Sequence, residues 1–148
     1  MASKKEYHET ETSLKVTCDV RVRFNETDAL GIVWHGCYLN YFEDGREAFG
    51  RTHGISYLEF KAQGFVAPIV KSSCEHKLPL QYGDIATIEA TYIHSAAAKM
   101  IFHYKIFNQD GNVVCTGETV QVFLNDQREL LLDAPDFFKA WQQKHNLI

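Results

Sequence analysis

The chain has 148 residues, the length of one ordinary domain, so two independent hydrophobic cores are not expected. Hydrophobic residues make up 45% of the chain and charged residues 23%, which is typical of a globular protein and not of a disordered one. The formal net charge is −4, and no run of basic residues exceeds two. Nucleic acid is therefore excluded as a main partner, because phosphate binding requires a concentrated basic surface.

No apolar run approaches the roughly 20 residues of a membrane-spanning helix, so no transmembrane segment is expected. The polar stretch 1–13 lacks the apolar core of a secretory signal, and we interpret it as a polar lead-in. The cysteines form no Cys-x-x-Cys pair, and the histidines show no metal-ligand spacing. We therefore expect no metal site, and free thiols in a reducing cytoplasm, at Cys18, Cys37, Cys74 and Cys115.

Residues 14–24 alternate strictly between apolar and polar side chains, which predicts a half-buried strand. From Tyr38 the period changes, and the apolar stripe recurs at helical spacing through Phe42, Gly45 and Phe49. Gly45 lies on this stripe, where the absence of a side chain leaves room for another backbone to approach. Gly50 or Gly54 can end the helix with a left-handed cap.

A second short helix is predicted over residues 56–64, with Ser56 as N-cap, Glu59 in the capping-box position and Gly64 as the stop. The remaining segments predict strands at 65–78, 85–95, 99–107 and 113–125, with an Asp-Gly hairpin turn at 108–112 and a closing helix at 134–146. Pro68 indicates an edge or a bulge in the first of these four strands.

The order of these elements predicts an α+β fold in which an antiparallel sheet curls around one long central helix. We find no internal repeat or linker, so residues 1–148 are expected to form a single domain. The high apolar content favours a dimer, with sheets meeting edge to edge or helices meeting at a seam.

Asp28 is the leading candidate for chemistry, because it lies in the loop between the first strand and the long helix. The alternative is that Asp28 only caps a turn before Gly31, since Asp-x-x-Gly is a common turn composition. The apolar run 32–34 that follows favours a chemical role, since a dry wall beside a carboxylate makes it more basic or more nucleophilic.

His35 and Gly36 lie where the helix is expected to begin. Backbone N–H groups of a first helical turn have no partner within the helix, so they can hold the oxyanion formed when a carbonyl is attacked. The His35 side chain can add a hydrogen bond or carry a proton; the alternative is a structural or surface histidine.

Other patterns are weak. Ser72 and Ser73 show no nucleophile-elbow motif, and the glycines form no phosphate loop, so no cofactor is expected. Glu43 and Glu47 lie four residues apart on one helix face and could act as paired carboxylates, but a solvated or dimer-facing acidic surface is the better interpretation.

Two segments, VRVRFNETDALGIVWHGCYLNYFEDGRE and the later HKLPLQYGDIATIEATY, resemble the 4-hydroxybenzoyl-CoA thioesterase group of hotdog-fold proteins, especially the acyl-CoA thioesterases associated with the Tol-Pal envelope system. The resemblance covers roughly residues 16–132. It implies a helix wrapped by an antiparallel sheet, homodimers with active sites at the interface that often pair into tetramers, and hydrolysis of an acyl thioester. By position, Asp28 matches the catalytic aspartate, and His35 matches the residue whose backbone N–H faces the thioester carbonyl.

The chain departs from this family at two places. Many members have Tyr where this chain has Phe24, and Phe cannot donate a hydrogen bond. Many also place Arg or Lys, which meet the phosphates of coenzyme A, where this chain has alanines at 96–98. Lys99 remains nearby and Lys105 lies further along, which leaves room for an acyl carrier protein as the thiol donor.

The resemblance and the residues together indicate an acyl-CoA thioesterase. Asp28 would act as nucleophile or general base, and His35 with Gly36 would be the oxyanion donors. The substrate would be bound by Trp34, Tyr38 and Lys99. Phe42 is a further candidate to line the acyl pocket, although core packing is the better interpretation of this residue. The alternatives are an acyl-carrier-protein thioesterase, a non-catalytic protein that binds acyl thioesters, and a dehydratase or hydratase that uses Asp28 and His35.

Overall fold

The computed structural model describes residues 14–148, so the predicted lead-in at 1–13 lies outside the described residues. The elements in chain order are β1 (Lys15–Arg21), the 3₁₀ turn η1 (Phe24–Glu26), α1 (Cys37–His53), α2 (Tyr57–Ala62), β2 (Ile69–His76), β3 (Ile85–Ile93), β4 (Lys99–Phe107), β5 (Val113–Val122) and α3 (Asp136–Lys144). None of the helices within 14–148 is long and apolar enough to cross a membrane.

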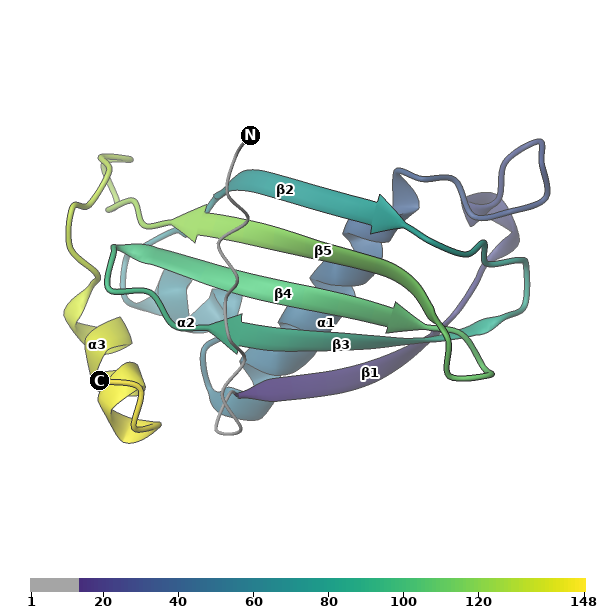
Figure 1. Cartoon of the computed structure of the whole chain (residues 1–148). Coiled ribbons are helices and arrows are strands. Elements are labelled where there is room, and N and C mark those ends of the chain that lie inside the picture. Colours follow the sequence, from purple (N-terminus) through teal and green to yellow (C-terminus); the bar gives the residue numbers. More distant parts are fainter. Residues whose placement is uncertain (1–13) are drawn as a thin grey trace, which may run out of the picture.

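The five strands form one sheet in the order β1-β3-β4-β5-β2, and every neighbouring pair is antiparallel. Helix α1 lies against one face of this sheet, and α3 lies at the end of the sheet where β3 finishes and β4 begins (Figure 1). The predicted α+β hotdog arrangement, a sheet around a long helix, is therefore confirmed.

The differences from prediction lie at the ends of the elements. The first strand ends at Arg21 and not at residue 24, because Phe24 already belongs to η1. The closing helix is shorter than predicted, since it begins after Pro135 and ends at Lys144. The irregularity predicted from Pro68 is present, because β2 is an edge strand whose register shifts between Ile69 and Lys71.

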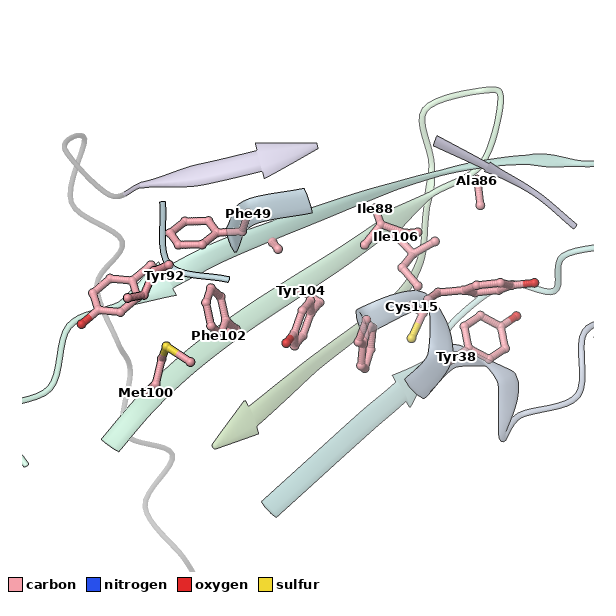
Figure 2. Close-up of a cluster of buried hydrophobic side chains, with 14 of the residues drawn as sticks. Tyr38, Phe49, Ala86, Ile88, Tyr92, Met100, Phe102, Tyr104, Ile106 and Cys115 are labelled. Carbon is pink, nitrogen blue, oxygen red and sulfur yellow. The ribbon is translucent and has the colours of Figure 1, made fainter. Parts of the chain in front are cut away.

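Helix α1 is held by the burial of its aromatic stripe. Phe42 is fully buried and stacks on Tyr104 of β4, with ring centroids 4.4 Å apart and planes 10° from parallel. The same ring covers Gly117 of β5, where an added Cβ would collide with it. Further along the helix, Phe49 packs edge-on to Phe102 with centroids 5.0 Å apart. Figure 2 shows Phe49, Phe102 and Tyr104 among the side chains of this buried cluster.

Gly45 has a different role from the predicted one. A Cβ at this position would lie 2.7 Å from the Ile88 side chain of β3. The absence of a side chain thus admits a neighbouring side chain of the sheet, and not another backbone.

Strand β2 leaves one edge of the sheet without a partner strand among residues 14–148. Its side chains are mostly exposed, including Ile69 and Val70 at 42% and 59%. An edge of this kind presents unpaired backbone N–H and C=O groups that can pair with another chain.

Phe42→Ala should destabilise the protein by about 3–5 kcal/mol, because it removes a fully buried ring and leaves a cavity between α1 and the sheet. The free energy of unfolding from urea denaturation measures the effect. Phe24→Ala is the matched control, since Phe24 is 77% exposed and its loss should cost less than about 1 kcal/mol. Equal losses for the two variants would contradict the packing described.

Candidate active site

The loop that carries Asp28 is a small hairpin between β1 and α1. Thr27 and Val33 form an antiparallel bridge, and Ile32 bridges to Gln81 of the turn that precedes β3. The Asp28 N–H donates to the carbonyl of Ile32 at 2.9 Å, and the Val33 N–H donates to the carbonyl of Leu80 at 2.8 Å. The candidate carboxylate is therefore held by backbone hydrogen bonds on a defined frame.

Glu26 ties this hairpin to helix α1. Its carboxylate accepts hydrogen bonds from the Arg23 N–H at 2.7 Å and from the Tyr41 hydroxyl at 3.1 Å. Its carbonyl accepts the Trp34 N–H at 2.8 Å. Burial and the negative charge of Glu26 raise the pKa of Tyr41, so this phenol remains a hydrogen-bond donor. Sequence reasoning missed Glu26, because its partner Tyr41 lies fifteen residues away.

The Asp28 side chain does cap a turn. One carboxylate oxygen accepts the Leu30 N–H at 2.8 Å, and the Asp28 carbonyl accepts the Gly31 N–H at 2.9 Å. Gly31 has φ +78°, a conformation that favours glycine. The other oxygen, Oδ2, accepts no hydrogen bond from residues 14–148, so the capping role leaves half of the carboxylate available for chemistry.

Helix α1 begins at Cys37, immediately after the two residues predicted to supply N–H donors. Gly36 is the N-cap, and no side chain caps the helix there. Neither the His35 N–H nor the Gly36 N–H donates a hydrogen bond to a residue of the described range 14–148. The Trp34 indole covers Gly36, where a Cβ would collide with the ring, and Trp34 also packs against the His35 imidazole with centroids 4.9 Å apart.

The apolar wall predicted beside Asp28 is only partly formed within one chain. Val33 is buried at 3% exposure, but Trp34 is 50% exposed and the neighbouring Leu30 is 81% exposed. Large apolar side chains exposed next to a candidate catalytic group leave a surface that another molecule or a second chain can cover.

Two of the aromatic residues predicted for the substrate pocket lie in the core. Tyr38 is 3% exposed and packs edge-on against Tyr41 and His76, with centroids 5.8 Å and 4.8 Å apart. Phe42 is fully buried on Tyr104, which confirms core packing, the preferred interpretation of this residue: packing of α1 on the sheet occupies its ring.

Lys99 lies far from Asp28 within the chain. Lys99 is the first residue of β4. The Asp28 hairpin pairs with the turn before β3, which lies beyond the last residue of β4. Nine residues of strand separate these ends, about 30 Å at the rise of an antiparallel strand. Figure 1 shows the hairpin and the β3–β4 turn at opposite ends of the sheet. One chain therefore cannot place Lys99 beside its own Asp28.

A cavity of about 560 Å³ lies between α1, α2 and the sheet. Its walls combine apolar side chains with a few polar groups, and they are formed by Glu43, Arg46, Glu47, Arg51, Ile55, Ser56, Tyr57, Leu58, Phe60, Ala67, Ile69, Met100 and Gln121. Met100 follows Lys99 directly, so this cavity and Lys99 share one end of the molecule. Neither Asp28 nor His35 lines the cavity.

The polar groups of the cavity are fixed by hydrogen bonds. The Arg46 guanidinium donates to the Tyr104 hydroxyl at 3.1 Å, and that hydroxyl contacts Thr119 Oγ1 at 2.6 Å. Gln121 is 8% exposed, and its amide nitrogen donates to the carbonyl of Ala67 at 2.7 Å. The amide oxygen, Oε1, has no hydrogen-bond partner in the described part of the chain. Glu43 and Glu47 are exposed at the rim, where Glu47 pairs with Arg51 at 3.8 Å.

Two further features were not predicted. Tyr82 packs edge-on to Phe24 with centroids 5.8 Å apart, so a phenol lies next to the position where the family often has Tyr. Cys74, His76 and Cys115 come together across β2 and β5, with their ligating atoms within 4.8 Å of one another. Sequence spacing could not show this cluster, because Cys74 and Cys115 lie 41 residues apart.

The chain matches a known class of proteins over most of its length. A family described as the thioesterase-like superfamily matches residues 22–142, most of the chain. The chain therefore belongs to the thioesterase-like superfamily, and it is an enzyme of the thioester hydrolase class.

Two of the similar proteins are named for activity on acyl-CoA thioesters. A putative acyl-CoA thioesterase of Bacillus subtilis, YneP, is 33% identical over 95 residues, which cover 64% of this chain and 69% of that protein. The acyl-CoA thioester hydrolase YbgC of Escherichia coli is 25% identical over 103 residues, which cover 70% of this chain and 77% of that protein.

Solved structures agree on the fold. A DHNA-CoA thioesterase from Staphylococcus aureus superposes with a TM-score of 0.80, covering 90% of this chain and 92% of that one at 23% identity. A hypothetical protein from Aquifex aeolicus superposes with a TM-score of 0.74, covering 84% of this chain and 97% of that one at 27% identity. The predicted resemblance to hotdog thioesterases is thus confirmed.

The buried phenol of Tyr38 should make stability depend on pH. Burial raises its pKa to about 12, above the value of about 10 for an exposed tyrosine. Ionisation therefore favours the unfolded chain, and the wild type should lose stability relative to Tyr38→Phe as the pH rises from about 10 towards 12. Urea denaturation of both proteins across this range measures the difference. Tyr82→Phe, at a 65% exposed position, should keep the wild-type profile; a constant difference between wild type and Tyr38→Phe would contradict the burial.

Proposed function

We propose that this chain hydrolyses acyl-CoA thioesters with Asp28 as the reacting carboxylate and the start of α1 as the oxyanion site. One observation carries the proposal: one oxygen of the Asp28 carboxylate and the N–H groups of His35 and Gly36 lie in the same short segment between β1 and α1, and none of them pairs with a residue of the described range 14–148. The names of YneP and YbgC support acyl-CoA as the substrate class. The four free thiols support a reducing cytoplasm as its location.

The proposed reaction uses only groups of the protein, without a resident cofactor. As nucleophile, Asp28 would attack the thioester carbonyl, expel the thiolate and form a mixed anhydride, which water then hydrolyses. As general base, it would take a proton from water as that water attacks the same carbonyl. In both routes the carbonyl oxygen becomes negative, and N–H donors at the helix start stabilise that charge by roughly 3–4 kcal/mol per donor. The products are the same free acid and thiol.

We propose that the complete site forms between two chains of a homodimer. The hairpin with Asp28 and the cavity with Lys99 lie at opposite ends of β2 and its neighbours. If two β2 edges pair antiparallel about a two-fold axis, each end of one sheet comes next to the opposite end of the other. That arrangement would bring Asp28 of one chain towards the cavity of its partner and would also pair the free edge of β2. Pairing of two such dimers would give a tetramer.

The two candidate thioesterase activities differ in the group that carries the acyl chain, which is coenzyme A in one and an acyl carrier protein in the other. Lys99 supports binding of coenzyme A phosphates, and a structural neighbour from Staphylococcus aureus was solved in complex with CoA. The alanines at 96–98 favour an acyl carrier protein as the alternative, and a chloroplastic acyl-acyl carrier protein thioesterase of Arabidopsis thaliana is 30% identical over 102 residues. Rates on matched acyl-CoA and acyl-carrier-protein substrates of the same chain length decide between them.

Asp28→Asn should lower kcat by about 10²–10⁴-fold on an acyl-CoA panel, because the amide can neither attack nor accept the proton. The measurement is thiol release with a chromogenic disulfide. Asp126→Asn, at an exposed turn, is the matched control and should keep the wild-type kcat. Near-full activity of Asp28→Asn would exclude Asp28 as the reacting group.

Leu58→Trp should block the cavity from a position that is 69% exposed, so folding should be spared while kcat/KM falls at least tenfold. If the site is shared between chains, an equal mixture of Asp28→Asn and Leu58→Trp chains, after exchange of subunits, should recover about one quarter of the wild-type activity. Half of the dimers would then be mixed, each with one intact site of two.

Sedimentation velocity should give a dimer or a tetramer for the wild type. A monomer with full activity would contradict the shared site. Full activity of Leu58→Trp alone would show that the cavity does not receive the acyl group, and failure of the mixture to recover activity would place the cavity and Asp28 of the same site in one chain.

A further inference from the structure

The cluster of Cys74, His76 and Cys115 lies between the sheet and the first turn of α1. Cys74 and His76 are two residues apart on β2, so their side chains project from the same face of the strand. Cys115 of β5 pairs in register with His76, and its Sγ lies 3.1 Å from Sγ of Cys74. All three ligating atoms lie within 4.8 Å of one another.

We propose that these three side chains bind one thiophilic transition-metal ion, with Zn²⁺ as the first candidate. Two thiolates and one imidazole are a ligand set that zinc accepts in tetrahedral geometry, and soft sulfur ligands select zinc or Cu(I) over Mg²⁺ and Ca²⁺. Three protein ligands leave the fourth position open to water or to an external thiol. His76 is exposed, so an ion can reach the cluster from solvent.

The strand geometry favours a metal ion over a disulfide. Cys74 faces Gly117 and Cys115 faces His76, so the two cysteines are diagonal neighbours of an antiparallel pair. Diagonal Cα atoms lie about 7–8 Å apart, at or beyond the reach of an unstrained disulfide, whose limit is about 7 Å. A tetrahedral Zn²⁺ with Zn–S bonds of about 2.3 Å holds its two sulfurs about 3.8 Å apart, which needs only small side-chain rotations.

Neighbouring groups support the ligands. The Tyr38 ring packs edge-on against the His76 imidazole, with centroids 4.8 Å apart and planes at 75°, and so orients it. The form of each cysteine that binds a metal is the thiolate, so a bound cation would replace the proton of each thiol. Figure 2 shows Cys115 and Tyr38 together at one end of the buried cluster, away from Phe49 and Tyr92.

The proposed metal site shares no residue with the Asp28 hairpin, and it does not depend on the proposed catalytic route. The site lies beneath the first turn of α1. Tyr38, three residues after His35, belongs to that turn and packs against the His76 imidazole. A bound ion would link two residues of the edge strand β2, Cys74 and His76, to Cys115 of β5.

Calorimetric titration of the reduced full-length protein with ZnCl₂ tests the site, with a phosphine reductant in place of thiols that compete for zinc. We expect one Zn²⁺ per chain and a rise in the thermal unfolding temperature on binding. Co²⁺ in place of Zn²⁺ should give the near-ultraviolet absorption of a thiolate-to-cobalt charge transfer.

His76→Asn should lower the zinc affinity at least tenfold, and Cys74→Ser, which removes one of the two thiolates, should weaken the cobalt thiolate band at least twofold. His94→Asn and Cys18→Ser are the matched controls, since both residues lie outside the cluster, and they should bind zinc like the wild type. His76 is exposed, so its variant remains informative even if the buried Cys115→Ser variant does not fold.

Absence of zinc binding would overturn the proposal, and so would binding unchanged in His76→Asn and Cys74→Ser. Intact-mass detection of a Cys74–Cys115 disulfide that forms readily in air, without zinc binding by the reduced protein, would replace the metal site with a redox pair. Loss of acyl-CoA hydrolysis in Asp28→Asn, with zinc binding retained, would leave the metal proposal standing, since the two tests depend on different residues.

Discussion

The burial of the aromatic stripe of α1 is the constraint on which the rest of this structure depends. Phe42 and Phe49 are both fully buried against the sheet, and each buried aromatic side chain removes a large apolar area from water. Their partners come from β3, β4 and β5, which are distant in sequence from the helix and from the first strand. Small residues at the contact, Gly45 on the helix and Gly117 on β5, let the helix lie close to the sheet.

Because α1 is fixed in this way, the position of its first residue is fixed as well. The hairpin with Asp28 enters the helix through Gly36 and is tied back to it by Glu26 and Tyr41. The candidate carboxylate and the N–H groups of His35 and Gly36, which pair with no residue of 14–148, are therefore held by the same packing that forms the core. This follows a general pattern in which reactive groups lie on short loops that a rigid scaffold positions.

The features expected of a thioesterase site lie at two opposite ends of the part of the chain that the structure describes. Asp28 and the helix start lie at one end, and the cavity and Lys99 lie at the other, separated by the length of the strands. The edge of β2 pairs with no further strand of residues 14–148, and Leu30 and Trp34 are exposed apolar residues. In the proposed dimer a second chain would cover these features. The proposed symmetric pair of chains would account for both observations with one arrangement, since a two-fold axis exchanges the ends.

The sequence by itself determined the elements and their periods. Alternation marked β1, helical spacing marked α1, and the Asp-Gly turn marked the β4–β5 hairpin, because side-chain periodicity is a local property of the chain. It also placed Asp28 and His35 in the loop before the helix, where the structure finds them. Only the tertiary structure decided that Lys99 lies at the opposite end from Asp28, and that Cys74, His76 and Cys115 meet. These relations depend on which strands pair and in which register, and pairing is set by the burial of residues far apart in the chain.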